Sequence, residues 1–444
     1  MTVFNENFEK NMIWNKLKTG LLKKSFKSLL EQETLSFFFA VMCVLILPVY
    51  AWYLPPFMVL WALTRILENN SKRDVLIRNR GHSWWLFFLF TGYYLWQLVG
   101  LIYSDNIANG VNIFFSRLSL FIFPLALVIP GKKIETKGKI LLKLFAGSTL
   151  FFIICCFLNA FYKSIVFQNG QLLFNPHPSE GYWMSYFYGS YFSFNQHPSY
   201  LAMYATLSVF IAFESWSDKS IKTRQRILWL VTGIFLLFSI YFLSSRAGFL
   251  ALVILLPFYF FYKLKKVFKG IIIILSVLVF LLASITILRT NERIGIVLNQ
   301  ISDGTFKEKA SHDSRILIWG SSFQIIRNNF ILGVGTGDVR DELMKEYKII
   351  GDEDLIKSQY NAHNQFIEIF LENGIIGLIL FLTIIGTMIY IAITDKNLLY
   401  GVFIIMMVVF FMFETILYRL AGVAFFSLFS FLLLFIPEKE GNNF

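Results

Sequence analysis

Long apolar runs separated by short polar segments dominate the 444-residue chain. A helix needs about 20 residues to cross the apolar core of a bilayer, so each run predicts a membrane-spanning helix. One of the runs is interrupted by a single charge, Arg117, and the others are uncharged. The runs are 84–103, 107–130, 144–162, 199–213, 227–245, 247–262, 270–288, 374–394, 398–413 and 420–436.

The uncharged segment 35–64 is too long for one crossing and contains Pro55-Pro56, which interrupts a helix. We therefore predict two spans here, 35–53 and 56–69, and about 12 spans in total. This number places the basic segments together on the inner side, as the orientation rule of membrane proteins requires. These segments are Lys10 to Lys27, Arg65 to Arg80, Lys132 to Lys143, Lys219 to Arg226 and Lys263 to Lys269.

Composition agrees with an all-α, polytopic membrane protein. Hydrophobic residues make up 56% of the chain, against roughly 45–50% in soluble domains, and charged residues only 15%. The formal net charge of +12 resides in loops on alternate sides of the apolar runs, which favours an orientation signal over nucleic-acid binding. The three cysteines, Cys43, Cys155 and Cys156, lie in apolar runs without metal-binding spacing, so we expect no disulfide and no cysteine-ligated metal.

The spans divide the chain into segments of different character. An inner N-terminal segment shows no removable signal peptide, helices 1–9 follow, and a large outer loop precedes helices 10–12 and an inner C-terminal tail. A second outer segment, 163–198, is aromatic and nearly uncharged, which suits the membrane interface and also stacking on sugar rings. The segments are 1–34, 35–288, 289–373, 374–436 and 437–444. In the large loop we expect short helices at 316–319 and 323–326, lying against the membrane.

Three chemically useful side chains fall on the outer side in this topology. Arg246 lies in the tight turn between two spans, and Arg315 lies four residues before Trp319 in the large loop. Simpler interpretations are a snorkelling side chain for Arg246 and a solvated partner of Asp313 for Arg315. The third residue, His363, lies where the large loop leads back into the membrane.

His363 would share one face of a continuous helix with four other residues, Ile367, Phe370, Gly374 and Gly377. The glycines on this face would allow another helix to pack closely below the imidazole. The simpler interpretation is an interfacial histidine that caps a helix.

Two arginines and a histidine on one membrane face indicate group transfer from a diphosphate. The guanidinium fork binds phosphate oxygens bidentately and keeps its charge. A neutral imidazole, with a reference pKa near 6.5, can accept a proton from a sugar hydroxyl. We expect Arg246, Arg315 and His363 to converge in one outer pocket. The loop Gly333 to Asp338 offers backbone amides to an anion, but no Gly-Lys-Ser/Thr follows it, and a tight turn is the favoured role.

Other polar residues have two interpretations each. Arg117 would lie about 15 Å deep in its span, either lining a groove for a lipid diphosphate or pairing with a neighbouring helix. His197 lies at an outer helix start, where it could orient substrate or, in the favoured interpretation, cap the helix. Glu414 and Arg419 flank one outer turn and are expected to pair with each other.

The order of these motifs resembles the outer-loop signature of the O-antigen ligase and O-antigen polymerase superfamily. The central pattern is His363-Asn364, nine residues, then Gly374 and Gly377. The supporting motifs are Ser245-Arg246-Ala247-Gly248, Arg315 with Trp319, and Gly333-Val334-Gly335-Thr336-Gly337. Asn329-Phe330 stands where many relatives have a proline, which affects only the local turn.

This resemblance implies a metal-independent, inverting glycosyltransferase of the C type in the bacterial inner membrane, with cytoplasmic termini, a periplasmic active site and no cofactor. The donor would be an undecaprenyl-diphosphate-linked glycan, and the acceptor lipid A–core oligosaccharide. By the same resemblance, Arg246 and Arg315 would bind the donor diphosphate, and His363 would activate the acceptor hydroxyl. Arg117, His197, Asn364 and Trp319 are further candidates for substrate binding.

Three alternatives remain open at this point. The first is the O-antigen polymerase reaction, in which another lipid-linked glycan is the acceptor, and the second is protein O-glycosylation. The third is a transporter of lipid-linked glycan, which is disfavoured because transporters place polar groups near the bilayer midplane and most candidates here are at the outer surface.

Overall fold

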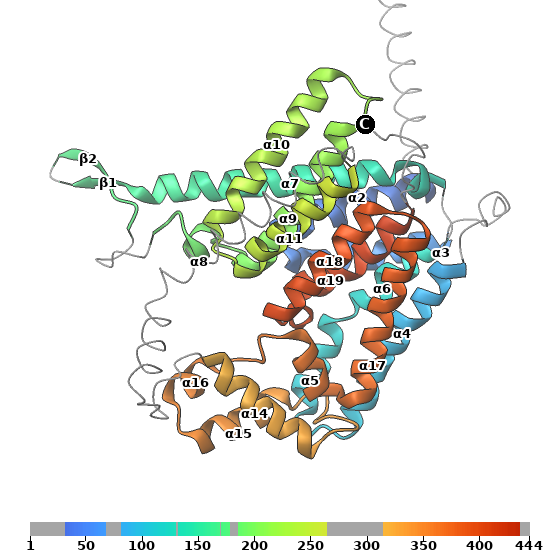
Figure 1. The fold of residues 1–444 in the computed structure, drawn as a ribbon, viewed down its shortest axis with the longest axis vertical. Coiled ribbons are helices and arrows are strands. Elements are labelled where there is room, and N and C mark those ends of the chain that lie inside the picture. The colour runs from blue at the N-terminus through green and yellow to red at the C-terminus, as the bar shows by residue number, and fades with distance from the viewer. Residues whose placement is uncertain are drawn as a thin grey trace, which may run out of the picture.

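The computed structural model describes residues 32–67, 81–129, 132–168, 170–177, 185–263 and 314–435. Within these ranges the protein is almost entirely helical, with one antiparallel hairpin. Figure 1 shows a bundle of long helices with a separate layer, α14 to α16, at one end. The elements are α2 (Gln32–Val49), η1 (Ala51–Tyr53), α3 (Leu54–Leu67), α4 (Gly81–Ile102), α5 (Ile107–Ser116), α6 (Ser119–Val128), α7 (Lys132–Ser164), β1 (Ile165–Gln168), β2 (Gln171–Phe174), α8 (Gly189–Phe192), α9 (Pro198–Ser217), α10 (Thr223–Phe242), α11 (Arg246–Lys263), α14 (Ser314–Asn328), α15 (Val339–Ile350), α16 (Glu353–Ser358), α17 (Gln365–Thr394), α18 (Leu398–Phe413), η4 (Ile416–Tyr418), α19 (Leu420–Leu432) and η5 (Leu433–Phe435).

Six of these helical segments are long and apolar enough to cross a membrane, which confirms a polytopic membrane protein. They are Gly81–Ile102, Ile107–Val128, Thr136–Ser164, Thr223–Phe242, Arg246–Lys263 and Gln365–Thr394. Shorter apolar helices lie at Glu33–Val49, Ala51–Leu67, Leu398–Phe413 and Leu420–Phe435. The predicted span 270–288, most of the basic inner segments and both termini lie outside the described residues, so twelve crossings remain a prediction.

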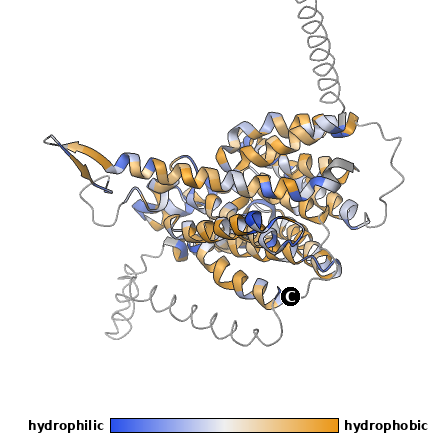
Figure 2. Ribbon diagram, turned by 90° about the horizontal axis from the view of Figure 1, so that it is seen from above, coloured by the Kyte–Doolittle hydropathy of each residue, from blue (hydrophilic) through white to orange (hydrophobic). Residues whose placement is uncertain are grey.

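The exposed face of α10 shows why this bundle suits lipid rather than water. From Ile227 onward its exposed side chains are large and apolar, and they recur mostly at intervals of three or four residues, so they form one stripe along the helix. They are Ile227, Leu228, Val231, Ile234, Phe238 and Tyr241. A soluble helix would present polar side chains on this face. Figure 2 shows the same predominance of apolar residues over most of the bundle.

The double proline begins a helix instead of lying in the middle of a break. The chain turns through η1 after α2, and Pro55 and Pro56 lie in the first turn of α3. This position is favourable, because the first turn of a helix lacks partners for its N–H groups and proline has none to satisfy. The predicted interruption between two helices in 35–69 is therefore confirmed.

α9 lies at the centre of the bundle and is buried along almost its whole length. It packs against α7, α10, α11 and α18. Aromatic rings fill the space around it, with Tyr204 packing against Phe145 and Phe425. This core fixes the start of α9, and with it His197, at one end of the bundle.

The continuous helix expected through His363 is wrong. α17 begins at Gln365, with the Asn364 side chain capping its first N–H groups, and His363 precedes it with a left-handed φ of 46°. The helix also breaks at Gly374, where φ is 63° and ψ is −165°. The break admits the loop after α14, because a Cβ at Gly374 would collide with the Ile331 carbonyl.

The segments predicted to lie on the outer side contain elements that the apolar pattern indicates only in part; one group of them, α14 to α16, is called the outer layer below. A single helix, α14, covers both stretches where short helices were expected, and α15 and α16 complete the layer. In the aromatic outer segment the structure adds a hairpin, β1–β2, in which Ile165 pairs with Phe174. Trp183 and Tyr182 lie outside the described residues.

Candidate functional site

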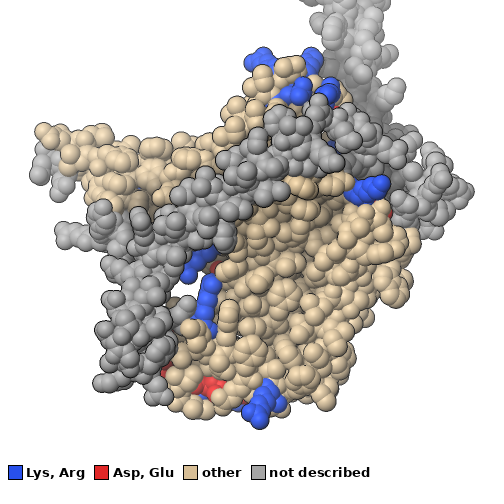
Figure 3. Space-filling model, viewed as in Figure 1, with Lys and Arg blue, Asp and Glu red and all other residues tan. Residues whose placement is uncertain are grey.

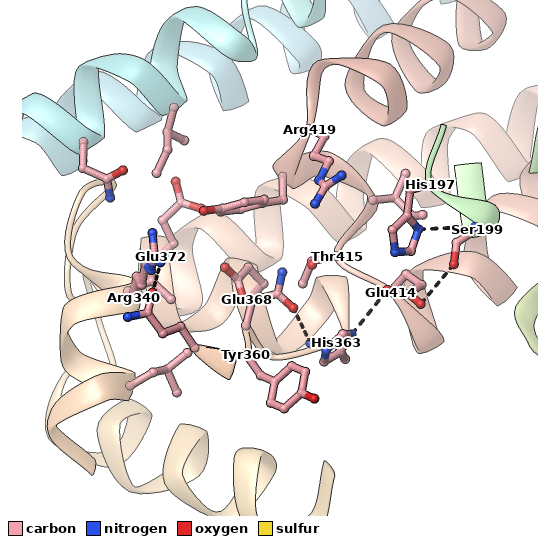
Figure 4. Close-up of a pocket in the computed structure, with 18 of the residues that line it drawn as sticks. His197, Ser199, Arg340, Tyr360, His363, Glu368, Glu372, Glu414, Thr415 and Arg419 are labelled. Atoms are coloured by element: carbon pink, nitrogen blue, oxygen red, sulfur yellow. Dashed lines mark hydrogen bonds and ion pairs between the residues drawn. The ribbon is translucent and has the colours of Figure 1, made fainter. Parts of the chain in front are cut away.

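A polar cavity of about 300 Å³ lies where the α14–α16 layer meets the bundle. Six segments that are far apart in the chain contribute to it: α5 with its C-cap, the start of α9, the 336–343 segment, the chain before α17, the first turns of α17, and the α18–α19 connection. Figure 4 shows ten of the lining side chains with labels. The residues are Asn109, Ile113, Arg117, His197, Ser199, Tyr200, Thr336, Val339, Arg340, Leu343, Ser358, Gln359, Tyr360, Asn361, His363, Glu368, Glu372, Glu414, Thr415, Ile416, Tyr418 and Arg419.

His363 is held at this cavity by the backbone before it. Its N–H donates to Asn361 Oδ1 at 3.1 Å, and the Ala362 N–H donates to Glu368 Oε2 at 3.1 Å. Trp319 Nε1 donates to the Ala362 carbonyl at 2.9 Å from the other side. A left-handed conformation at a non-glycine residue is strained, and such strain persists where the surroundings determine it. Several hydrogen bonds around His363 therefore fix the position of the imidazole.

The partner of His363 is Glu414, in the connection after α18. His363 Nδ1 lies 3.3 Å from Glu414 Oε2, and the Ser199 hydroxyl donates to Glu414 Oε1 at 3.1 Å. Burial raises the pKa of Glu414, but its hydrogen bond to His363 and the charges of His363 and His197 outweigh burial and leave this pKa below its usual value. The expected pairing of Glu414 with Arg419 is therefore wrong, since the carboxylate faces the two histidines and Ser199.

His197 has the favoured role of a helix cap, and a role in orienting substrate remains a prediction. It caps α9, because its Nδ1 accepts from the Ser199 N–H at 3.3 Å, and it also lines the cavity. Burial lowers the pKa of His197, the charges of Arg419 and His363 lower it further, and Glu414 opposes them. The lowered pKa favours the neutral ring, which is the form that can accept a hydrogen bond in a cap.

Arg117 pairs with a neighbouring helix, which confirms one of its two interpretations; it also lines the cavity, and a role toward a lipid diphosphate remains a prediction. Its Nη1 lies 2.5 Å from Glu372 Oε1, and both side chains are only 2% exposed. The same guanidinium donates to Gln97 Oε1 and to the Leu417 carbonyl. Arg117 lies between α5 and α6, at a point where the helix is interrupted.

Four other predicted residues lie outside the lining of this cavity. Arg315 packs over the Phe413 ring at 5.8 Å and donates to the Phe413 carbonyl at 3.5 Å. Asn364 Nδ2 donates to the Met412 carbonyl at 3.3 Å. Both thus contact the chain directly before Glu414, and Trp319 supports Ala362 as described.

Arg246 is the first residue of α11 and is exposed. Figure 3 shows basic side chains bordering a hollow between the bundle and the outer layer, on a face that is otherwise largely uncharged. His363, His197 and Arg117 are brought together by the cavity. A common pocket of Arg246 and Arg315 with His363 remains a prediction, and Asp313, the expected partner of Arg315, lies outside the described residues.

The glycine loop acts as a structural element, which favours the tight-turn role. Gly333 and Gly335 have left-handed φ values of 75° and 103°. The Val334 and Gly335 N–H groups donate to the Leu371 and Glu372 carbonyls at 2.8 and 3.1 Å. These amides are committed to α17 at its break and are therefore not available to an anion.

Beyond this loop, the Asp338 carboxylate accepts from the Asp105 and Asn106 N–H groups, each at 2.8 Å. The same segment is thus tied to the turn between α4 and α5. The outer layer consequently has hydrogen bonds to two different parts of the bundle.

Sequence reasoning missed the buried carboxylates Glu368 and Glu372. A signal was present, since two carboxylates four residues apart at the start of a membrane-length run share one helix face. Tyr360 and Arg340, which also line the cavity, had no such signal. Arg340 donates to the Gln359 side chain, a contact set by the fold of the outer layer.

The fold and the cavity define a class: a polytopic helical membrane protein with a polar, histidine-containing site at one end of its bundle. Residues 231–382 match the family model described as O-Antigen ligase, which supports placement of the chain in the O-antigen ligase superfamily and confirms the resemblance inferred from the motifs. Family members are membrane glycosyltransferase-like enzymes. A search of curated proteins finds no matching relative.

The matched segment includes Arg246, Arg315 and His363 but not every wall of the cavity. Glu414 and His197 lie outside it. The site is therefore assembled from the matched segment and from helices before and after it.

Proposed function

We propose that this protein is an O-antigen ligase-type glycosyltransferase that moves a glycan from undecaprenyl diphosphate to lipid A–core oligosaccharide on the periplasmic side of the inner membrane. The observation that carries the proposal is the position of His363. It lines a polar cavity at one end of an apolar bundle, inside the segment that matches the ligase family. A lipid-linked donor requires such an arrangement, because its polyprenyl chain stays in the bilayer while its diphosphate and glycan lie beyond it.

In the proposed reaction His363 takes the proton of the acceptor hydroxyl. The acceptor oxygen forms a bond with the anomeric carbon of the donor, and the bond from that carbon to the diphosphate oxygen breaks. Undecaprenyl diphosphate leaves from the opposite face, so the anomeric configuration inverts. A positioned general base contributes typically 10²–10⁴-fold to such a rate.

Arg246 and Arg315 are proposed to hold the diphosphate and to stabilise the charge that develops on it as the bond breaks. Arginine suits this role because it stays charged and its planar fork matches phosphate oxygens. With these charges in place, the transfer needs neither a metal nor a cofactor.

The test is transfer by purified protein in proteoliposomes containing undecaprenyl-diphosphate-linked glycan and lipid A–core oligosaccharide, with EDTA present. His363→Ala should lower transfer by about 10²–10⁴-fold while binding of the donor persists. The matched control is His82→Ala, since His82 is exposed at the start of α4, contacts the Tyr390 ring and lies outside the cavity. Unchanged turnover in His363→Ala would refute the proposal for this residue.

For the arginines, donor affinity is the measurement. Arg246→Ala and Arg315→Ala should weaken donor binding, and Arg→Lys should restore it only in part because lysine lacks the fork. Arg224→Ala is the control, since Arg224 is an exposed arginine at the other end of α10 from the turn that carries Arg246. Extension of the lipid-linked glycan in the absence of lipid A–core would instead identify a polymerase.

A further inference from the structure

The pair formed by His363 and Glu414 bears on which imidazole nitrogen can accept a proton. A neutral imidazole carries one N–H and one lone pair, and the partner of one nitrogen decides the form of the other. An ionised carboxylate only accepts hydrogen bonds. Glu414 is 23% exposed and lies 3.3 Å from His363 Nδ1, so a proton on Nδ1 is the arrangement that satisfies both groups.

Glu414 is itself held in place from two sides. Ser199, at the start of α9, donates to its second oxygen, and the Glu414 N–H donates to the Phe410 carbonyl at the end of α18. Arg315 contacts the Phe413 carbonyl and ring directly before it. The carboxylate is therefore a fixed acceptor rather than a mobile surface group.

Other charged groups face this pair from the elements packed around it. His197 and Arg419 lie on the side of the α9 start and the α18–α19 connection, and Glu368 lies on the side of α17. Glu368 Oε2 accepts from the Ala362 N–H, so it is committed to the backbone and does not replace Glu414 as the acceptor. Glu414 is thus the described carboxylate that contacts the His363 ring.

We infer that Glu414 is a positioning residue that holds His363 with its proton on Nδ1 and its lone pair on Nε2, the nitrogen left to meet a hydroxyl in the cavity. This inference rests on the proposed role of His363 as the base. It also explains why a segment outside the family match completes the site, because the acceptor of the histidine comes from the α18–α19 connection. Without Glu414 the imidazole could rotate or carry its proton on Nε2, where it can donate but not accept.

The first measurement needs no substrate. ¹⁵N-histidine labelling in proteoliposomes gives separate shifts for protonated and unprotonated ring nitrogens, and the chain has only five histidines. The His363→Ala variant assigns the His363 signals. In the wild type at neutral pH we expect a protonated Nδ1, and in Glu414→Gln a loss of this preference, because an amide can donate to Nδ1. A protonated Nε2 in the wild type, or an identical spectrum in Glu414→Gln, overturns the inference.

The second measurement is transfer. Glu414→Gln should lower kcat at least 10-fold, with KM for donor and acceptor within about twofold, because the residue orients the base and does not touch substrate. Glu414→Asp keeps the carboxylate and should recover part of kcat, which a merely structural role would not predict. An equal loss in Glu414→Asp and Glu414→Ala, or a loss confined to KM, would contradict it.

The matched control is Glu214→Gln on the other end of α9. Glu214 is 27% exposed and accepts from Lys263 and the Tyr259 hydroxyl, away from the cavity. It should leave kcat and the histidine spectrum unchanged. If the spectrum behaves as expected but His363→Ala transfers glycan normally, the proposed base fails while the arrangement of Glu414 stands. The two failures are therefore distinguishable.

Discussion

Two pairs line the same cavity, an arginine with a carboxylate and an imidazole with a carboxylate, and they differ in almost every physical respect. Arg117 and Glu372 meet at 2.5 Å with 2% of each side chain exposed, whereas His363 and Glu414 meet at 3.3 Å with 28% and 23% exposed. The Arg117 guanidinium has two further acceptors within the protein, Gln97 Oε1 and the Leu417 carbonyl. His363 keeps one ring nitrogen for a ligand. The fold needs both members of the buried pair Arg117–Glu372 (the dry pair), because neither charge can be left alone, whereas the accessible pair His363–Glu414 keeps a ring nitrogen that can do chemistry.

The largest effect is expected from substitutions that break the dry pair, Arg117–Glu372. Arg117→Ala or Glu372→Ala should destabilise the protein by about 3–5 kcal/mol, because each leaves a buried charge without its partner. Unfolding in detergent micelles, followed by tryptophan fluorescence, measures this. The double variant Arg117→Met/Glu372→Leu should recover most of the loss, since apolar replacement removes both charges together. Additive losses in the double variant would mean that the two residues do not act as a pair.

A smaller effect is expected at the helix break beside Glu372. Gly374→Ala should cost roughly 1–3 kcal/mol, because the left-handed backbone is strained for alanine and its Cβ would press on the Ile331 carbonyl. Gly386→Ala is the control on the same helix, where a Cβ meets nothing within 4 Å. That substitution should be neutral or slightly stabilising, since alanine is the better helix former. Equal stability of the two variants would show that the break does not constrain the fold.

Removal of the accessible pair should hardly change stability. His363→Ala and Glu414→Ala should each change the free energy of unfolding by less than about 1 kcal/mol, because partly exposed pairs contribute little. The same micelle unfolding assay compares them with the dry pair. A loss as large as that of Arg117→Ala would erase the distinction between the two pairs.

The smallest effect is a dependence of stability on pH. The pKa of His197 lies below its ordinary value in the folded protein, so the unfolded chain binds the proton first as pH falls below about 6.5. The folded state should therefore lose stability between pH 7 and pH 5. The lowered pKa of Glu414 adds a further loss only at lower pH, where this carboxylate protonates. Melting temperatures across this range test it.

The control for the pH effect is His197→Asn. Asparagine can still cap α9 but does not titrate. This variant should show a flatter dependence between pH 7 and pH 5, and an unchanged slope would assign the effect to another group.

Among the described residues the apolar pattern was sufficient to predict the long helices, because lipid allows few alternatives to a long apolar helix. The helix of His363 was predicted wrongly because periodicity alone cannot register a break. The break at Gly374 depends on contact with the loop 331–335, and nothing in the sequence around Gly374 indicates this contact. The partner of Glu414 was also predicted wrongly, because local sequence does not report contacts between distant segments. Arg419 is near Glu414 in sequence, whereas His363 is near it only in space.

Hydrogen bonds of main-chain groups, and not of side chains alone, hold the outer layer to the bundle. Val334 and Gly335 use α17 carbonyls, and Asp338 accepts from the turn after α4. If the segment 314–362 were produced alone as a water-soluble fragment, these groups would lose their hydrogen-bond partners in the bundle. Such a fragment would not reproduce the native layer, so antibodies or inhibitors selected against it would recognise a different shape from the one in the intact protein.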